Sequence, residues 1–223
     1  MFEINSMHYE IRRGIVVKTE NAAKPETQRS AFLKSLLADL PPVSASVDYG
    51  CGKLRYCEAI LERTDTLAIV DSEIQLSRMQ TLKGMKSTIR DAVRRSNRIR
   101  VYNDAEFDRL DGDFDRAFCI NVLSAIPVLA RRRQVMEVIR SHLRPNGTCL
   151  YVVQYRNSDF NRMRAMHNAR SWRDGFLIYS LRGFSFYGLI SPDCLISTAK
   201  KAGFAICHVR RNEGSVYVWA SRR

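Results

Sequence analysis

A glycine-containing turn and an acidic residue further along form the pattern with the clearest chemical meaning in this sequence. The turn consists of Asp48, Tyr49, Gly50, Cys51 and Gly52, directly after a short run of small and β-branched residues. Glycine lets the backbone turn tightly and approach a ligand closely. Asp71 ends the next apolar run about 20 residues later, where a carboxylate can accept hydrogen bonds from both hydroxyls of a ribose. Together the two features favour a site for a nucleoside cofactor.

Each feature alone also has a structural explanation, since turns use glycine for conformational reasons and a loop aspartate can cap the helix that follows it. Two related phosphate-binding patterns do not fit. Arg55 stands where the dinucleotide pattern G-x-G-x-x-G has its third glycine, and Gly52-Lys53 is followed by Leu54 instead of the Ser or Thr of a P-loop. The sequence therefore argues against a pyrophosphate at a helix N-terminus, and so against NAD or FAD.

Strands that alternate with helices must position this site. Apolar runs predict strands at 44–49, 66–70, 98–102, 114–120 and 148–154. Helices are expected at 26–39, 55–63 and 130–143, with a polar amphipathic helical region at about 74–95. This alternation is typical of a mostly parallel sheet with helices on both faces, which binds ligands beyond the carboxyl ends of its strands.

The alternation stops after residue 154. Residues 156–190 are rich in arginine and aromatic residues and have no clean period. A helix is expected up to about residue 202 with Gly203 as its C-terminal cap, followed by a hairpin of strands at 204–210 and 215–221. We therefore predict one domain over 1–223, with an N-terminal extension at 1–25 and a substrate-side insertion at 156–190.

Five segments in the right order resemble the motifs of class I S-adenosylmethionine-dependent methyltransferases, over roughly 30–155 and again at 191–221. Residues 48–52 look like the family's D-x-G-C-G motif, and residues 143–147 match its L-R-P-x-G turn before the fifth strand. Between them lie Asp71, the segment Asp104-Ala105-Glu106 and a fourth-strand signature from Phe114 to Pro127.

The resemblance implies a three-layer, Rossmann-like α/β sandwich around a mostly parallel seven-stranded sheet with an antiparallel C-terminal hairpin. It implies S-adenosylmethionine as cofactor, with the glycine loop around its methionine part and Asp71, followed by Ser72, at the ribose. Asp104 and the backbone amide of Ala105 would meet the adenine, and Asn121 would line the pocket. The main departure is Leu54, where the family often has a further glycine; its side chain would narrow the loop.

The amino-acid composition indicates the class of protein, its location in the cell and the role of its cysteines. Hydrophobic residues make up 45% and charged residues 26% of the chain, which is typical of a globular protein. The sequence has neither an apolar run long enough to span a bilayer nor a secretory signal at its start, so we expect a cytoplasmic protein. The six cysteines and four histidines are scattered, which predicts reduced, structural cysteines and no metal site.

Three hypotheses on the methyl acceptor fit the sequence. The formal net charge of +13 and the arginines and aromatic residues of 156–182 favour nucleic acid, RNA or DNA. A small molecule is the alternative, because residues 121–124 read Asn-Val-Leu-Ser where base-modifying amino methyltransferases have Asp/Asn-Pro-Pro-aromatic. A non-catalytic binding module with this fold is the third. Tyr155, His167 and Tyr187 are candidate bases by position alone, so no catalytic residue is predicted.

Overall fold

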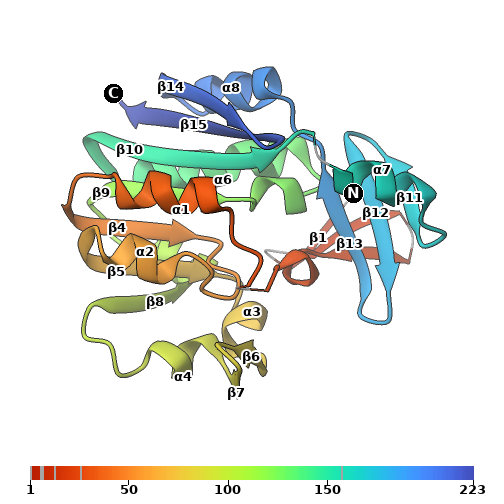
Figure 1. Cartoon of the computed structure of the whole chain (residues 1–223), viewed down its shortest axis with the longest axis horizontal. Coiled ribbons are helices and arrows are strands. Elements are labelled where there is room, and N and C mark those ends of the chain that lie inside the picture. Colours follow the sequence, from red (N-terminus) through yellow and green to blue (C-terminus); the bar gives the residue numbers. More distant parts are fainter. Residues whose placement is uncertain (1, 6–7, 13, 26, 157) are drawn as a thin grey trace.

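The five apolar runs form the parallel part of a seven-stranded sheet in the computed structural model, which describes residues 2–5, 8–12, 14–25, 27–156 and 158–223 (Figure 1). They are β4 (Val43–Tyr49), β5 (Thr64–Asp71), β8 (Ile99–Asn103), β9 (Phe114–Ile120) and β10 (Leu143–Gln154). The C-terminal hairpin, β14 (Phe204–Asn212) and β15 (Ser215–Arg222), completes the order β14-β15-β10-β9-β4-β5-β8. Because β15 runs antiparallel to β10 and to β14, the predicted sheet and hairpin are confirmed.

Helices cover both faces of this sheet. One face packs against α1 (Ala31–Ala38), α2 (Cys57–Leu61), α3 (Glu73–Ser77) and α4 (Ile89–Val93). The other packs against α5 (Asp104–Asp108), α6 (Leu129–Ser141) and α8 (Pro192–Lys201). Successive side chains of a strand point to opposite faces, so Leu67 and Ile69 of β5 join the first core while Ala68 and Val70 join the second. The predicted three-layer sandwich is confirmed.

The predicted helical region at 74–95 is wrong. It is divided into α3, a hairpin of β6 (Gln80–Leu82) and β7 (Met85–Ser87), and α4. Lys83 and Gly84 form the tip of the hairpin with φ angles of 48° and 80°. A two-residue turn with positive φ at both positions matches the twist of the strands and interrupts a helix.

The first predicted helix is shorter than expected, beginning at Ala31 and not at residue 26. Ser30 is its N-cap, and the Ser30 side chain accepts a hydrogen bond from the backbone N–H of Leu33 at 3.2 Å. A serine in this role ends the preceding extended segment and satisfies an N–H group that has no partner within the helix.

A second, six-stranded sheet joins the N-terminal segment to the insertion, in the order β1-β2-β3-β13-β12-β11 (Figure 1). Its strands are β1 (Phe2–Asn5), β2 (His8–Arg12), β3 (Ile15–Lys18), β11 (Ala169–Trp172), β12 (Gly175–Ser180) and β13 (Gly183–Gly188). The helix α7 (Ser158–Ala165) precedes β11. The insertion lacked a clear period because β12 is apolar on both faces: Phe176 packs on Phe160 and Met163 under α7, and Leu177 packs on the main core.

An ion pair fixes the second sheet to the first. Arg132 on α6 is 2% exposed, and its Nε donates to the carbonyl oxygen of Ile126 at 2.8 Å. Its Nη2 donates to Asp174, in the turn between β11 and β12, at 3.1 Å. The guanidinium carbon lies 5.7 Å from the ring centre of Phe186 on β13. A helix arginine therefore positions the insertion.

Candidate functional site

The glycine loop follows β4 in a conformation that requires glycine. Gly50 and Gly52 have φ angles of 78° and 56°. The N–H groups of Gly50 and Cys51 both donate to the carbonyl oxygen of Val70 on β5, at 2.7 and 3.1 Å. A Cβ atom on Gly50 would lie 2.2 Å from Cγ2 of Val122, which follows β9. The loop is therefore held against two neighbouring strands with no room for a side chain.

Leu54 adopts the backbone conformation that a glycine would favour at this position. Its φ is 59°, in the left-handed region that is strained for a branched residue. The Leu54 side chain is buried in the core with Leu33 and Ile60. Because it packs away from the loop's ligand side and does not line the cavity described below, it does not narrow the loop as the sequence suggested.

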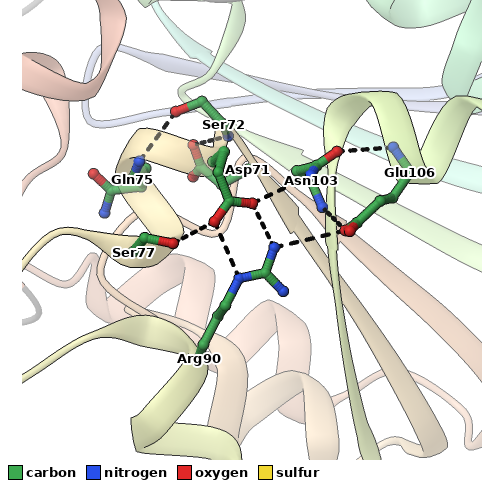
Figure 2. Close-up of polar contacts among 8 residues, drawn as sticks. Asp71, Ser72, Gln75, Ser77, Arg90, Asn103 and Glu106 are labelled. Atoms are coloured by element: carbon green, nitrogen blue, oxygen red, sulfur yellow. Dashed lines mark hydrogen bonds and ion pairs between the residues drawn. The ribbon is translucent and has the colours of Figure 1, made fainter.

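Asp71 ties this loop to the start of α3. Its Oδ2 accepts from the N–H of Gly52 at 2.9 Å and its Oδ1 from the N–H of Ser72 at 2.8 Å. Ser72 itself caps α3, because its hydroxyl accepts from the N–H of Gln75 at 3.2 Å (Figure 2). The alternative interpretation of Asp71 as a helix cap therefore does not apply; that part is played by Ser72.

The buried carboxyl groups of Asp48 and Asp71 interact electrostatically at this edge of the sheet. The pKa of Asp48 is raised to about 7, chiefly by burial and also by the charge of Asp71, while Arg55 opposes the shift. Burial also raises the pKa of Asp71 to about 6, against the lowering effect of its two backbone N–H donors. A cation bound beside both groups would stabilise their ionised forms.

A polar network fixes the ends of β5 and β8 beside each other (Figure 2). Glu73 accepts from Arg90, from the hydroxyl of Ser77 and, at 3.2 Å, from Nδ2 of Asn103. Asn103 and Glu106 form a capping box at the start of α5, with both hydrogen bonds at 2.8 Å. The hydrogen bond from Arg90 lowers the pKa of Glu73 to about 2, so Glu73 is ionised over the physiological range.

The loop and Asp71 line a cavity, here called the first cavity. The sheet contributes Asp48, Gly50, Cys51, Gly52, Asp71 and Asn121 to its walls. The N-terminal segment, including the short helix η1 (Thr19–Ala22), contributes Thr19, Glu20, Ala22, Ala23 and Lys24. No local sequence pattern predicts that η1 lies beside the loop, because this closeness comes from the long-range pairing of β3 with β13.

Four of the predicted site residues lie outside the walls of the first cavity. Tyr49 points into the core, with its ring centre 5.8 Å from that of Phe107. Ser72 caps α3. Asp104 and Ala105 begin α5, where Asp104 is buried and Ala105 is exposed. The structure therefore brings together the loop, Asp71 and Asn121, with the α5 residues at the adjacent strand end.

Buried polar atoms without partners indicate that a polar ligand completes this site. Within the described part of the chain, Oδ1 of Asn121 and Oδ2 of Asp104 are buried and have no hydrogen-bond partner. Asn121 also has a φ of 61°, a strained conformation that residues at binding sites often adopt. Unpaired buried acceptors are costly, so donors such as the hydroxyl and amino groups of a nucleoside fit here.

A second cavity of about 290 Å³ continues from the first. The two share Ala22, Lys24, Arg55, Tyr56, Asn121 and Ala125. Its other walls come from both sheets and include Arg29, Ser124, Gln154, Phe186, Tyr187 and Tyr217. Of the candidate bases, only Tyr187 reaches it, and the Tyr187 hydroxyl donates to Oε1 of Gln154 at 2.5 Å. His167 is exposed and Tyr155 packs against the main core.

The described residues show neither a cluster of metal-ligating residues nor a helix that could span a membrane. They contain no group of three or more His, Cys, Asp or Glu residues that could hold a metal ion. Their helices include none that is long and apolar enough to cross a membrane.

Comparisons with known proteins agree with this geometry. A family model described as a methyltransferase domain matches residues 23–209. The uncharacterized protein YmfD from Escherichia coli is 30% identical over 211 residues, which cover 92% of each chain. Both relationships extend over the glycine loop, Asp71, Asn121 and most of the insertion.

Solved structures share the fold at lower identity. The protein PH0226 from Pyrococcus horikoshii has a TM-score of 0.66 and 15% identity, over 86% of this chain and 88% of its own. The N-methyltransferase NodS from Bradyrhizobium japonicum, in complex with S-adenosylhomocysteine, has a TM-score of 0.54 and 12% identity, over 86% and 84%. The pyocyanin biosynthetic protein PhzM has a TM-score of 0.58 and 14% identity over 85% of this chain, which spans 55% of the length of PhzM.

The matched family model covers most of the chain, the sheet has seven strands with the expected antiparallel C-terminal hairpin, and the predicted glycine loop and acidic residue meet at one cavity. The chain belongs to the class I S-adenosylmethionine-dependent methyltransferases, and S-adenosylmethionine is its cofactor.

Proposed function

We propose that this enzyme methylates a small molecule bound in the second cavity, with S-adenosylmethionine in the first. The observation that carries the proposal is the second cavity, which shares a wall with the first and is lined by both sheets. Its volume of about 290 Å³ suits a small ligand. Two neighbouring cavities that share Asn121 and Arg55 can hold a donor and an acceptor in contact, as methyl transfer requires.

The cofactor supplies a methyl group on a positively charged sulfur. In this proposal Asp71 accepts hydrogen bonds from the ribose, Asp104 and Ala105 contact the adenine, and the loop at 50–52 surrounds the methionine part. Oδ2 of Asp71 accepts from the N–H of Gly52 and from the Cys51 thiol, whereas Oδ1 has one backbone donor and a further lone pair. The carboxylate can therefore hold the loop and accept from a ribose through Oδ1. Asn121 has a free acceptor at the wall common to both cavities, where it can orient the acceptor's N–H or O–H.

The surface expected to bind nucleic acid exposes one aromatic residue, Tyr179, and buries most of the others. Phe160 and Phe176 are buried beneath α7, and Trp172 packs edge-on against Phe186, at 5.7 Å between ring centres. The arginines of 156–182 are exposed: Arg156, Arg162, Arg164, Arg170, Arg173 and Arg182. Tyr179 alone among the described aromatic residues of 156–182 is exposed, so these arginines form a mainly solvated basic surface and not a groove that stacks successive bases. The similarity to a pyocyanin biosynthetic protein also favours a small acceptor over the nucleic-acid hypothesis.

Fractionated cell material tests the proposal. The enzyme and S-adenosylmethionine are incubated with either a metabolite ultrafiltrate or purified RNA and DNA, and formation of S-adenosylhomocysteine is measured by mass spectrometry. We expect turnover with the metabolite fraction. Asp71→Asn is the control, since losing a charged acceptor for the ribose should weaken cofactor binding about tenfold to a hundredfold. Methyl groups recovered only in RNA or DNA would contradict the proposal.

A further inference from the structure

The second cavity is positively charged. Lys24, Arg29 and Arg55 line it, and its described lining contains neither an aspartate nor a glutamate. Lys24 and Arg55 also line the first cavity together with Glu20, Asp48 and Asp71, and Arg29 lowers the pKa of the exposed Glu58. On the side of the second cavity the three cations meet no carboxylate of the described lining, so an anion inside it would be attracted to all three.

Two of these cations are held in place by the walls. Arg55 donates from Nη1 to the carbonyl oxygen of Gln28 at 3.0 Å, and its guanidinium carbon lies 5.0 Å from the ring centre of Tyr56. The ammonium of Lys24 lies 5.1 Å from the ring centre of Tyr187. Both side chains therefore rest on aromatic faces that also line the cavity. Positioned charges of this kind recognise an acidic group better than flexible surface lysines do.

A buried hydroxyl without a partner lies in the same cavity. Ser124, in the short helix η2 (Leu123–Ala125), is 6% exposed, and its Oγ has no hydrogen-bond partner among the described residues. A serine hydroxyl can donate to an oxyanion. Together with the unpaired Oδ1 of Asn121, it shows that the cavity has polar groups that only a ligand satisfies.

The remaining walls are aromatic. Tyr56, Phe186, Tyr187 and Tyr217 contribute rings to the second cavity. Rings on several sides of a small cavity favour a flat or apolar ligand body, whereas the polar groups fix its orientation.

We infer that the methyl acceptor is a small aromatic carboxylic acid, whose carboxylate is recognised by Lys24, Arg29 and Arg55. This inference rests on the proposed function and adds the chemical class of its substrate. Arg29 is a specificity-determining residue in this view, since it lines the second cavity alone, whereas Lys24 and Arg55 also line the first.

Three probes of equal shape and different charge test the inference. Benzoate, benzamide and benzamidinium are titrated by calorimetry into the enzyme saturated with S-adenosylhomocysteine. We expect benzoate to bind at least tenfold more tightly than benzamide, and benzamidinium to bind more weakly than either. Arg29→Gln should reduce the preference for benzoate about tenfold. Arg94→Gln, which removes an exposed arginine that lines neither cavity, should leave the preference unchanged.

Benzoate that binds no better than benzamide, including no binding of either, overturns the inference. So does an Arg29→Gln variant that keeps the full preference for benzoate and the melting temperature of the wild type. Neither result touches the proposed function, because turnover with the metabolite fraction is measured separately and can succeed with a neutral acceptor.

Discussion

Asp48 and Asp71 give the first cavity a pH dependence. Their pKa values are raised to about 7 and about 6, chiefly by burial, so near neutral pH the empty cavity favours the protonated forms. In the protein without ligand, these raised pKa values favour folding at low pH, and that contribution is lost as the pH rises through about 6 to 7. A ligand with a positively charged sulfur reverses the preference, because it stabilises the ionised carboxylates.

The affinity for S-adenosylmethionine should therefore increase with pH. Calorimetry from about pH 6 to about pH 8 should show a rise of about tenfold, because the ionised fraction of a group with a pKa of about 7 rises about tenfold over that range. Asp48→Asn, which removes the group that titrates at about 7, should flatten the dependence. The affinity for S-adenosylhomocysteine, which lacks the sulfonium charge, should depend less on pH. An equal pH dependence in wild type and Asp48→Asn would exclude Asp48 as its origin.

Single residues at the site differ in how far sequence could place them. Gly50 and Asp71 were predictable because a turn at the end of one strand and a carboxylate at the end of the next must meet at one sheet edge. The orientation of the Tyr49 side chain was not predictable, since it depends on which face of the sheet the last residue of β4 points to. Arg132 lies between two other arginines on a polar helix, and only the folded insertion shows that it is buried.

At the scale of elements, the parallel strands were predictable and the second sheet was not. Strands buried on both faces are continuous apolar runs, as Leu67 to Val70 illustrates. The six-stranded sheet instead depends on the contact of β3 with β13, where Val17 pairs with Phe184. Local periodicity carries no information about such a pairing. The hairpin at 80–87 was missed because its two strands have only three residues each.

The ion pair between Arg132 and Asp174 holds the insertion on α6, which leads to a prediction about the second cavity. Asp174→Ala leaves the Arg132 charge buried, but Asp174 is partly exposed, so we expect a loss of about 1–2 kcal/mol in the free energy of unfolding. Because Phe186 and Tyr187 follow on β13, binding of acceptors should weaken while the affinity for S-adenosylmethionine changes little. Urea unfolding and calorimetry measure both effects.

Asp111→Ala is the matched control for this experiment, because it removes an exposed aspartate from a loop. Equal stability of the Asp174→Ala and Asp111→Ala variants would mean that the ion pair does not fix the insertion. A large loss of affinity for S-adenosylmethionine in Asp174→Ala would mean that the insertion supports the first cavity as well.

For the whole molecule, we propose that the two sheets and their helices form one unit around the ligands. The helix η1 connects them: Arg78 after α3 donates to the carbonyl oxygen of Glu20 at 2.9 Å. Asn21 donates to the carbonyl oxygen of Arg182, in the turn between β12 and β13, at 3.0 Å. His8 on β2 contacts Glu20 at 2.9 Å. The N-terminal extension and the insertion thus reach the first cavity through the same short helix.

If this proposal is correct, cofactor binding should protect both sheets from hydrogen exchange. A ligand at about 100 times its Kd stabilises the folded state by about 2.7 kcal/mol, and every segment that opens with the cavity shares this protection. Exchange followed by mass spectrometry should therefore slow at 8–22 and 175–188 as well as at 48–72 when S-adenosylhomocysteine is added. Lys200 and Lys201, the exposed last residues of α8, line neither cavity and serve as the internal control. Protection confined to 48–72 would show that the six-stranded sheet opens independently of the first cavity, which would contradict the proposal of one unit.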